Sequence, residues 1–301
     1  MQPRHIVLAV VLSIIWGLNF VVIAIGLTGF PPLLLAACRF VVVSLPVLFL
    51  PRPPLPWTTL ILLSGTLFVG QFALFFPAMA LGMPAGLGSI VLQAQAFVTI
   101  GIAAAVLGEF PSRRQLAGAA VALAGLVVIA TTVGTNGVTA AGLALSLGAC
   151  VFWATANVIL RRIGKVDLLA LISWLSLIAI PPFFLLCFIV EGPATIGHAF
   201  AHVSWVTVGA VLYIAVLSTS FGYAAWGYLL RIYPAAVAAP FSLLVPVTGT
   251  IAATLILGEK FGPRASCRHG PHPRRPRGAH AAPASPCAHG NRRRSTSPLR
   301  G

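Results

Sequence analysis

Long hydrophobic stretches recur along most of the chain, and short polar or glycine- and proline-containing segments separate them. About twenty consecutive apolar residues form a helix long enough to cross roughly 30 Å of hydrocarbon. A helix also satisfies its own backbone hydrogen bonds, as a segment inside a bilayer must. The pattern therefore predicts nine membrane-spanning helices, at 6–27, 33–50, 59–81, 85–106, 116–132, 139–160, 168–190, 205–230 and 235–257.

This pattern stops near residue 262. The last 39 residues hold nine of the 19 Lys and Arg residues of the chain and none of its four acids. A segment so rich in arginine and proline has too few apolar side chains to build a core. We therefore predict a disordered basic tail at 263–301, after a first repeat at 1–132 and a second at 139–262.

The composition places the chain in a lipid bilayer. Hydrophobic residues make up 58% of it and charged residues 8%, whereas soluble domains carry about 25% charged residues. Lys and Arg follow every second predicted helix, and the intervening loops contain neither, which predicts a cytoplasmic N-terminus. The residues that set this orientation are Arg4, Arg52, Arg113, Arg114, Arg161, Arg162, Lys165 and Arg231.

Two stretches align without a gap at an offset of 150 residues: MPAGLGSIVLQAQAFVTIGIAAAVLGE at 83–109 and YPAAVAAPFSLLVPVTGTIAATLILGE at 233–259. Upstream, WGLN at 16–19 corresponds to WATAN at 153–157. Each repeat has an odd number of helices, so the second repeat is inverted, and such repeats place a substrate site at their interface near mid-membrane. The expected fold is an all-α membrane protein with two inverted five-helix repeats, in which the tenth helix is missing.

The basic tail has an explanation at the level of codons. Residues 264–280 can be encoded by bases that, read one position later, give the apolar stretch GQVAGMALILGGLVVL. Its Q-x-A-G and G-L-V-V motifs then fall 150 positions after the same motifs at 115–118 and 125–128. Our hypothesis is that a frameshift replaced the tenth helix. The alternative is a genuine tail, which would put nine arginines outside the cell, against the usual bias.

The strings WGLNFV, PPLLLAACRF, GMPAGLGSIVLQAQAF and APFSLLVPV occur across both halves. Together they resemble the EamA branch of the drug/metabolite transporter superfamily, most closely its O-acetylserine/cysteine exporters, over about residues 1–262. The resemblance implies ten helices in two inverted repeats, a bacterial-type inner-membrane location and efflux of amino acids or metabolites such as cysteine or O-acetylserine. The missing tenth helix departs from it. The alternatives are a drug or lipophilic-compound exporter of the same superfamily and an inactive frameshifted product.

Polar and aromatic residues inside the apolar spans are the candidates for a substrate site, because such groups are costly at bilayer depth. An amide can bind both the ammonium and the carboxylate group of a zwitterion, and a guanidinium can bind a carboxylate through two hydrogen bonds. The substrate-binding candidates are Trp16, Asn19, Arg39, Gln71, Gln93, Gln95, Trp153, Asn157, Tyr223 and Trp226.

Each candidate also has a purely structural interpretation. Asn19 and Asn157 can hold helices together, and the aromatic residues are typical of packing or of interface anchors. Arg39 lies early in its helix, which favours extension of its side chain to the membrane surface. Gln93 and Gln95 stand two residues apart on a helix, so we expect at most one of them to face a cavity.

The absence of acids from the middle of the spans narrows the function. Glu109, Asp167, Glu191 and Glu259 all lie at the ends of predicted helices. Proton antiport through a buried acid is therefore disfavoured, and a neutral or zwitterionic small-molecule substrate is favoured. The tail matches neither a zinc pattern nor a folded nucleic-acid-binding motif. We expect a transporter with no enzymatic activity, metal, cofactor or nucleic-acid partner, and the sequence leaves its oligomeric state open.

Overall fold

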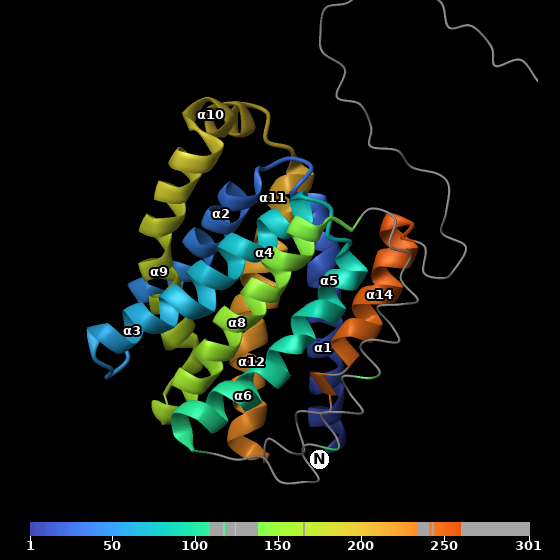
Figure 1. Cartoon of the computed structure of the whole chain (residues 1–301). Helices are drawn as coiled ribbons and strands as arrows, with labels where there is room; N and C mark the ends of the chain where they lie inside the picture. Colours follow the sequence, from blue (N-terminus) through green and yellow to red (C-terminus); the bar gives the residue numbers. More distant parts are fainter. Residues whose placement is uncertain are drawn as a thin grey trace, which may run out of the picture. The chain divides into compact units, whose positions relative to one another are not determined.

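The computed structural model describes residues 1–108, 117, 124, 138–164, 166–233, 241–242 and 244–259, without the side chains of 230 and 231. The backbone is helical over most of these residues (Figure 1). Contacts divide the chain into Met1–Ser266 and Cys267–Gly301, and every described residue belongs to the first unit. Several predictions fall outside the described residues: the helix at 116–132, the first part of the helix at 235–257, the tail at 263–301, and the positions of Glu109, Arg113 and Arg114.

The first half of the chain contains four apolar helical segments that run alternately up and down. Their elements are α1 (Pro3–Gly26); α2 (Pro32–Ser44) with the 3₁₀ helix η1 (Leu45–Leu48); α3 (Trp57–Leu63), η2 (Ser64–Gly70) and α4 (Gln71–Ala80); and α5 (Ala85–Val91), η3 (Leu92–Ala94) and α6 (Gln95–Leu107).

The second half continues in the same manner over its described residues. Its elements are α8 (Ala140–Arg162); α9 (Leu168–Leu186) with η4 (Cys187–Glu191); α10 (Pro193–Ala201); α11 (Trp205–Leu212), η5 (Tyr213–Phe221) and α12 (Gly222–Ile232); and α14 (Leu244–Leu257).

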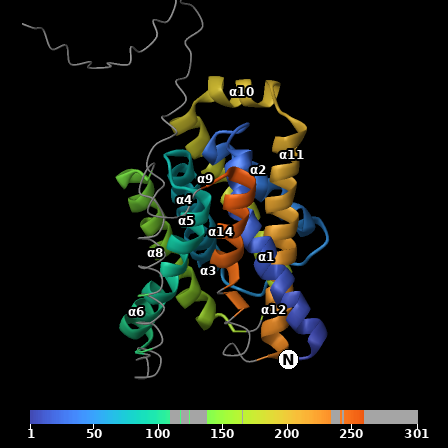
Figure 2. The ribbon, with the colours of Figure 1, turned by 90° about the vertical axis from the view of Figure 1, so that its right-hand side faces the viewer.

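Six of these segments are long and apolar enough to cross a membrane within the described part of the chain, and two shorter apolar helices, Pro32–Leu48 and Leu244–Leu257, accompany them. Each of the eight overlaps a stretch where the hydrophobic pattern predicts a span, with ends that differ by up to a few residues. Helix α10 was not predicted, because its nine residues are too few and too polar for a span. It lies across the end of the molecule opposite the N-terminus (Figures 1 and 2). We call these the α10 end and the N-terminal end.

Short sequence signals set the ends of the helices. Proline occupies the first position of α1, α2 and α10, where its missing N–H costs no hydrogen bond. The Asp167 side chain accepts the N–H of Ala170 at 2.9 Å and caps α9. Gly108 ends α6 with a φ of 68°, a left-handed conformation that suits glycine.

The main packing partner of most helices comes from the other half of the chain. Helix α1 runs along α14, α2 along α9, and α4 along α8, while α5 and α6 contact α14 and α8. Figure 1 shows α1 and α14 side by side, and α8 beside α4. The halves are therefore interleaved, and the space between them lies inside the helix bundle.

The contact between α1 and α14 is close enough to require glycine. A Cβ atom added at Gly17 would collide with Thr248 and with the backbone of Gly249. The Thr248 hydroxyl donates to the Ser13 carbonyl at 3.1 Å. Small residues of this kind allow membrane helices to approach closely.

Three spans contain π-helical turns: η4 ends the seventh span at Cys187–Glu191, and η2 and η5 interrupt two others at matching places. Helix η2 lies in the third span at Ser64–Gly70, and helix η5 lies in the eighth at Tyr213–Phe221. The two segments overlap at the same offset of 150 residues that relates the repeated sequences. Such π turns are uncommon and often occur at functional sites.

A polar cavity between the two halves

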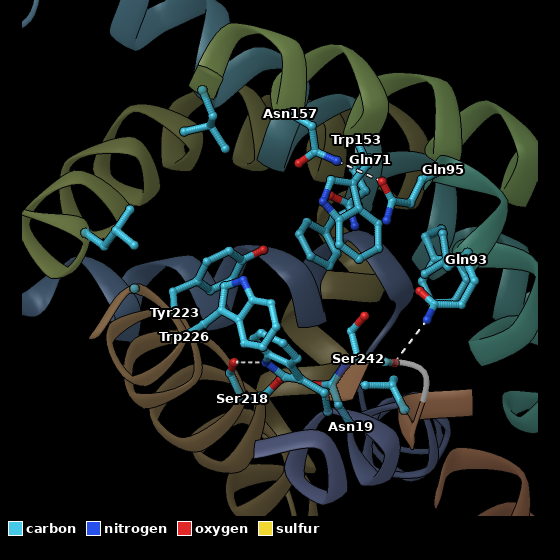
Figure 3. Close-up of a pocket in the computed structure, with 18 of the residues that line it drawn as sticks. Asn19, Gln71, Gln93, Gln95, Trp153, Asn157, Ser218, Tyr223, Trp226 and Ser242 are labelled. Carbon is cyan, nitrogen blue, oxygen red and sulfur yellow. Dashed lines mark hydrogen bonds between the residues drawn. The ribbon is translucent and has the colours of Figure 1, made fainter. Parts of the chain in front are cut away.

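A cavity of about 950 Å³ lies between the two halves of the chain. Its wall includes residues of α1, α2 and α4 from the first half and of α8, η5 and α12 from the second (Figure 3). All ten substrate-binding candidates lie on this wall, and whether they bind substrate stays a prediction: Trp16, Asn19, Arg39, Gln71, Gln93, Gln95, Trp153, Asn157, Tyr223 and Trp226.

Arg39 faces the cavity from α2. Its side chain is 2% exposed, so the expected extension to the membrane surface is wrong. Its Nε and Nη2 atoms donate to the Thr219 hydroxyl oxygen at 2.9 and 2.6 Å, and its guanidinium lies 4.2 Å from the centre of the Phe72 ring. A hydroxyl partner and an aromatic face hold the cation in place without an acid.

Thr219 was not among the predicted site residues, and its role depends on the π turn. Its hydroxyl donates to the carbonyl of Ile214, five residues earlier, at 2.6 Å. Because its proton is used there, the oxygen lone pairs remain to accept from Arg39. The run of hydroxyl residues at 218–220 inside an apolar span is the signal that could have identified it.

Gln71 and Asn19 each keep a buried acceptor atom. Gln71 begins α4 directly after the η2 turn and is 3% exposed. Its Oε1 atom and Asn19 Oδ1 are buried and have no hydrogen-bond partner among the described residues, as is also true of Arg39 Nη1. Three residues of the cavity lining thus each carry one buried polar atom that has no hydrogen-bond partner among the described residues.

Asn157 on α8, unlike Asn19 and Gln71, has its side-chain amide bonded to residues of another helix. Its Nδ2 atom donates to Gln95 Oε1 at 2.8 Å and lies 3.3 Å from the Thr99 hydroxyl. Thr99 in turn donates to the Gln95 carbonyl at 2.7 Å. These bonds join α8 to α6, as the structural interpretation of Asn157 expects, and its role in binding substrate stays a prediction.

Gln93 and Gln95 both line the cavity, which corrects the expectation that at most one of them would. The 3₁₀ helix η3 (Leu92–Ala94) lies between α5 and α6 and carries Gln93. A 3₁₀ turn advances about 120° per residue instead of 100°, so residues two apart lie closer to one face than in an α-helix. Gln93 Nε2 also donates to the Ser242 carbonyl at 3.2 Å.

Aromatic residues form one wall of the cavity. Trp16 donates from Nε1 to the Ser218 carbonyl at 2.9 Å, and its ring centre lies 5.6 Å from that of Trp226 and 6.2 Å from that of Tyr223. Figure 3 shows Tyr223 and Trp226 together on α12. This wall offers flat apolar surface beside the polar groups of α1, α2 and α4.

The cavity extends to the N-terminal end of the molecule. Its lining includes Leu160, Ile163 and Gly164 at the end of α8, and Ile232 and Tyr233 at the end of α12. Near the α10 end, by contrast, the first residue of α5 that lines the cavity is Ser89, one turn after the start of that helix. The cavity therefore runs from the middle of the bundle towards the N-terminal end.

At the α10 end, two carboxylates each join the end of one helix to the start of another. Glu191 accepts the N–H groups of Leu33 and Leu34 at 2.6 and 3.1 Å. Glu259 accepts those of Ala85 and Gly86 at 2.8 and 3.0 Å. In each case an acid at the end of one helix satisfies the free N–H groups at the start of another. No carboxylate lines the cavity among the described residues.

A family comparison agrees with this architecture. A model of the EamA-like transporter family matches residues 4–131 and matches residues 140–267 a second time. The chain belongs to this family. It is an integral membrane protein of the EamA type in the drug/metabolite transporter superfamily, and family membership indicates a transporter of a small molecule rather than an enzyme.

Two curated relatives and one solved structure are similar to this EamA protein. It is 42% identical over 267 residues to the "Probable amino-acid metabolite efflux pump" of Escherichia coli (strain K12), covering 87% of this chain and 89% of the relative. It is 26% identical over 269 residues to the "Probable terminal-alkyne amino-acid exporter" of Streptantibioticus cattleyicolor, covering 86% and 88%. A crystal structure of 19% identity, with a TM-score of 0.52 over 85% of this chain and 98% of that one, shares the fold alone.

Proposed function

We propose that this EamA protein is an inner-membrane efflux transporter for amino acids or their metabolites, such as cysteine or O-acetylserine, and that it works by alternating access. The cavity carries the proposal, because its wall combines amides and aromatic rings with the cationic Arg39. The 42%-identical relative is named as an efflux pump for amino-acid metabolites, and the name of the 26%-identical relative also refers to an amino acid.

The proposal includes two inverted repeats around the cavity. In a two-fold arrangement, the pairing of α4 with α8 should be mirrored by α1 with α12, and that of α1 with α14 by α6 with α8. All four of these pairs are in contact, which supports the arrangement. The matching π turns η2 and η5 support it as well. Alternating access follows if the repeats rock against each other about the cavity.

The proposed orientation in the membrane identifies the step of the transport cycle that this structure represents. With the N-terminus in the cytoplasm, the end towards which the cavity extends is the cytoplasmic end. An exporter loads its substrate from that side. The bonds of Glu191 and Glu259 then close the outer end, and export requires them to loosen.

The cavity charge favours this substrate class over a lipophilic cation. A cationic compound would meet the positive charge of Arg39, and the described lining residues include no carboxylate to balance it. A substrate with a carboxylate gains from the same charge. The drug-exporter alternative therefore becomes an outcome of the test below.

The test compares cells that produce the protein with cells that carry the empty vector. We expect faster release of labelled cysteine or O-acetylserine from the producing cells, and we expect Arg39→Gln to reduce it. Cells producing Ser173→Ala serve as the control, because Ser173 is buried away from the cavity lining. Resistance to cationic dyes without amino-acid release would reject the proposal and support a drug exporter.

A second test concerns the inverted repeats. Reactive tags are placed at 109 and at 259 in separate chains, and a membrane-impermeant reagent is added to intact cells. Inverted repeats put these positions on opposite faces, so only the tag at 259 should react. Reaction of both tags, or of neither, contradicts the architecture.

The tenth helix is also part of the proposal. We compare the chain of 301 residues with a variant that carries GQVAGMALILGGLVVL from position 264. Only the variant should export at the full rate, because a tenth helix covers packing surfaces that lipid would otherwise contact. Codons at 264–280 that are incompatible with this shifted reading, or equal export by both chains, would reject the frameshift hypothesis.

A further inference from the structure

The aromatic wall of the cavity follows directly after a π-helical stretch. Tyr223 and Trp226 lie on α12, which begins where η5 ends. The N–H of Gly222, the first residue of α12, donates to the carbonyl of Leu217, five residues earlier. An α-helix bonds residues four apart and turns 100° per residue, so α-helical geometry in place of this π turn would rotate α12 by about 100°. The direction in which Tyr223 and Trp226 point therefore depends on η5.

Thr219 holds this π turn with its side chain. Its hydroxyl donates to the carbonyl of Ile214, five residues earlier, at 2.6 Å. Helical hydroxyls usually reach the carbonyl four residues earlier, as those of Ser146 and Ser176 do. Arg39 on α2 donates to the same Thr219 oxygen from Nε and Nη2, at 2.9 and 2.6 Å. Both side chains are buried, which strengthens these bonds.

Helix α1 is attached to the same turn. The Tyr213 hydroxyl at the start of η5 donates to the Ile15 carbonyl at 3.0 Å. The indole N–H of Trp16 donates to the Ser218 carbonyl at 2.9 Å. A Cβ atom added at Gly222 would lie 2.6 Å from the nitrogen of this indole, so the two segments meet closely. The turn that sets the direction of α12 thus also fixes the tryptophan of α1.

These contacts bring three rings together on one side of the cavity. The centre of the Trp16 ring lies 5.6 Å from that of Trp226 and 6.2 Å from that of Tyr223, and all three residues line the cavity. Figure 3 shows Tyr223 and Trp226 extending into the pocket. Arg39 and Thr219 expose almost no surface. Their influence on the shape of the cavity therefore passes through this wall.

We infer that Thr219 and Arg39 are positioning residues, which hold the π turn η5 and so direct the aromatic wall towards the side chain of the substrate. This inference rests on the proposed function and narrows the substrate class to amino-acid metabolites with an apolar or aromatic side chain. Aromatic rings gain more from such a partner than from a small polar group, because ring contacts add to the burial of apolar area.

The test measures binding to the purified full chain by calorimetry with two probes, S-benzyl-L-cysteine and S-methyl-L-cysteine. The two probes share one amino-acid headgroup and differ in the ring. The ratio of their dissociation constants on one protein is compared, so a change in headgroup binding or a general loosening of the fold cancels. The wild-type chain should prefer the benzyl compound by about three- to tenfold, the size expected for one aromatic contact.

The variants change the link between Arg39, Thr219 and the turn. Thr219→Val keeps the size and branching of the side chain without the hydroxyl, and it should bring the ratio close to one. Thr219→Ser keeps the hydroxyl and should retain most of the preference. Arg39→Met removes the donors and should also lower the ratio. The double variant with Thr219→Val should lower it no further than the stronger single change, because both residues act on the same turn.

Thr66→Val is the matched control. Thr66 lies in the corresponding π turn η2, its hydroxyl donates to the Leu62 carbonyl at 2.7 Å, and it does not belong to the cavity lining. This variant should keep the wild-type ratio. If the changes at Thr219 and Arg39 prevent folding, Tyr213→Phe removes only the oxygen that binds the Ile15 carbonyl, and it should lower the ratio about twofold.

The possible outcomes separate this inference from the proposed function. Equal binding of both probes by the wild-type chain would overturn the inference and leave the proposed substrate class in place. The same holds for a Thr219→Val or Tyr213→Phe chain with the wild-type ratio, and for a loss in Thr219→Ser as large as that in Thr219→Val. A wild-type chain that binds neither probe would overturn the proposed function as well.

Discussion

The first helix of each half places a tryptophan and an asparagine on the cavity wall, and the two amides have different partners. On α1, the buried Oδ1 of Asn19 has no partner within the described residues, while Trp16 is held by the Ser218 carbonyl. On α8, Asn157 donates to Gln95 at 2.8 Å and is part of a hydrogen-bonded contact with α6. One amide oxygen has no partner among the described residues, and the other amide joins two helices.

The spacing of the two motifs contributes to this difference. Asn19 follows its tryptophan by three residues and Asn157 follows Trp153 by four. At 100° per residue, the asparagines lie about 60° to one side and 40° to the other side of their tryptophans. A motif can therefore be repeated in sequence while the two copies take different roles.

The largest expected effect comes from moving α1 itself. Gly17, beside Trp16, packs against Thr248 and Gly249, so Gly17→Leu would push α1 away from α14. We expect destabilisation of about 3 kcal/mol from overpacking. Size-exclusion chromatography should show little folded protein. A variant with the wild-type melting profile would contradict the close packing of α1 on α14.

The next effect tests the structural role on α8. Asn157→Leu removes the donor to the partly buried Gln95 Oε1 and with it the hydrogen bond between α8 and α6, at a cost of about 1.5 kcal/mol. Thermal unfolding of the purified protein should shift downwards. The preference for an amino acid over its methyl ester should not change. A changed preference with unchanged stability would reverse the roles assigned to the two asparagines.

The third effect tests the ligand role on α1. Asn19→Leu removes an acceptor that has no partner within the described part of the chain, so stability should stay within about 0.5 kcal/mol or rise. Export of labelled amino acid at low concentration should fall about tenfold, which corresponds to about 1.4 kcal/mol. A loss of stability like that of Asn157→Leu would show that Asn19 also joins helices.

The smallest expected effect is a coupling energy, which double-mutant cycles of the free energy of unfolding measure. Asn157→Leu and Gln95→Leu should be coupled by about 1 kcal/mol, because the two side chains share a hydrogen bond. Asn19→Leu and Gln95→Leu should be additive within about 0.5 kcal/mol. Coupling of equal size in both cycles would mean that the two amides are equivalent.

The sequence was sufficient to find residues that line the cavity. Polar and aromatic groups inside a span are costly in lipid, and Gln71 and Trp226 were selected for that reason alone. Both lie on the wall, together with the other eight candidates. The positions of the apolar spans were predictable for a similar reason, since hydrocarbon thickness fixes their length.

Local departures from α-helical geometry were not predictable, and they decide the partners of these residues. The η3 turn lets Gln93 and Gln95 share the cavity, and the η5 turn directs Thr219 towards Arg39. In an apolar run, these turns leave no periodic signal. The burial of Arg39 likewise depends on Phe72 and Thr219, which are distant from it in sequence.

The buried charge of Arg39 would also make the proposed transport cycle sensitive to the membrane potential. A membrane voltage of 100 mV acts on one elementary charge with about 2.3 kcal/mol across the full thickness. In the proposed alternating-access cycle, the guanidinium would lie across a different part of this voltage drop when the cavity opens to the other face. The empty carrier would then respond to the membrane potential, and a bound zwitterion, which is net neutral, would leave that response unchanged.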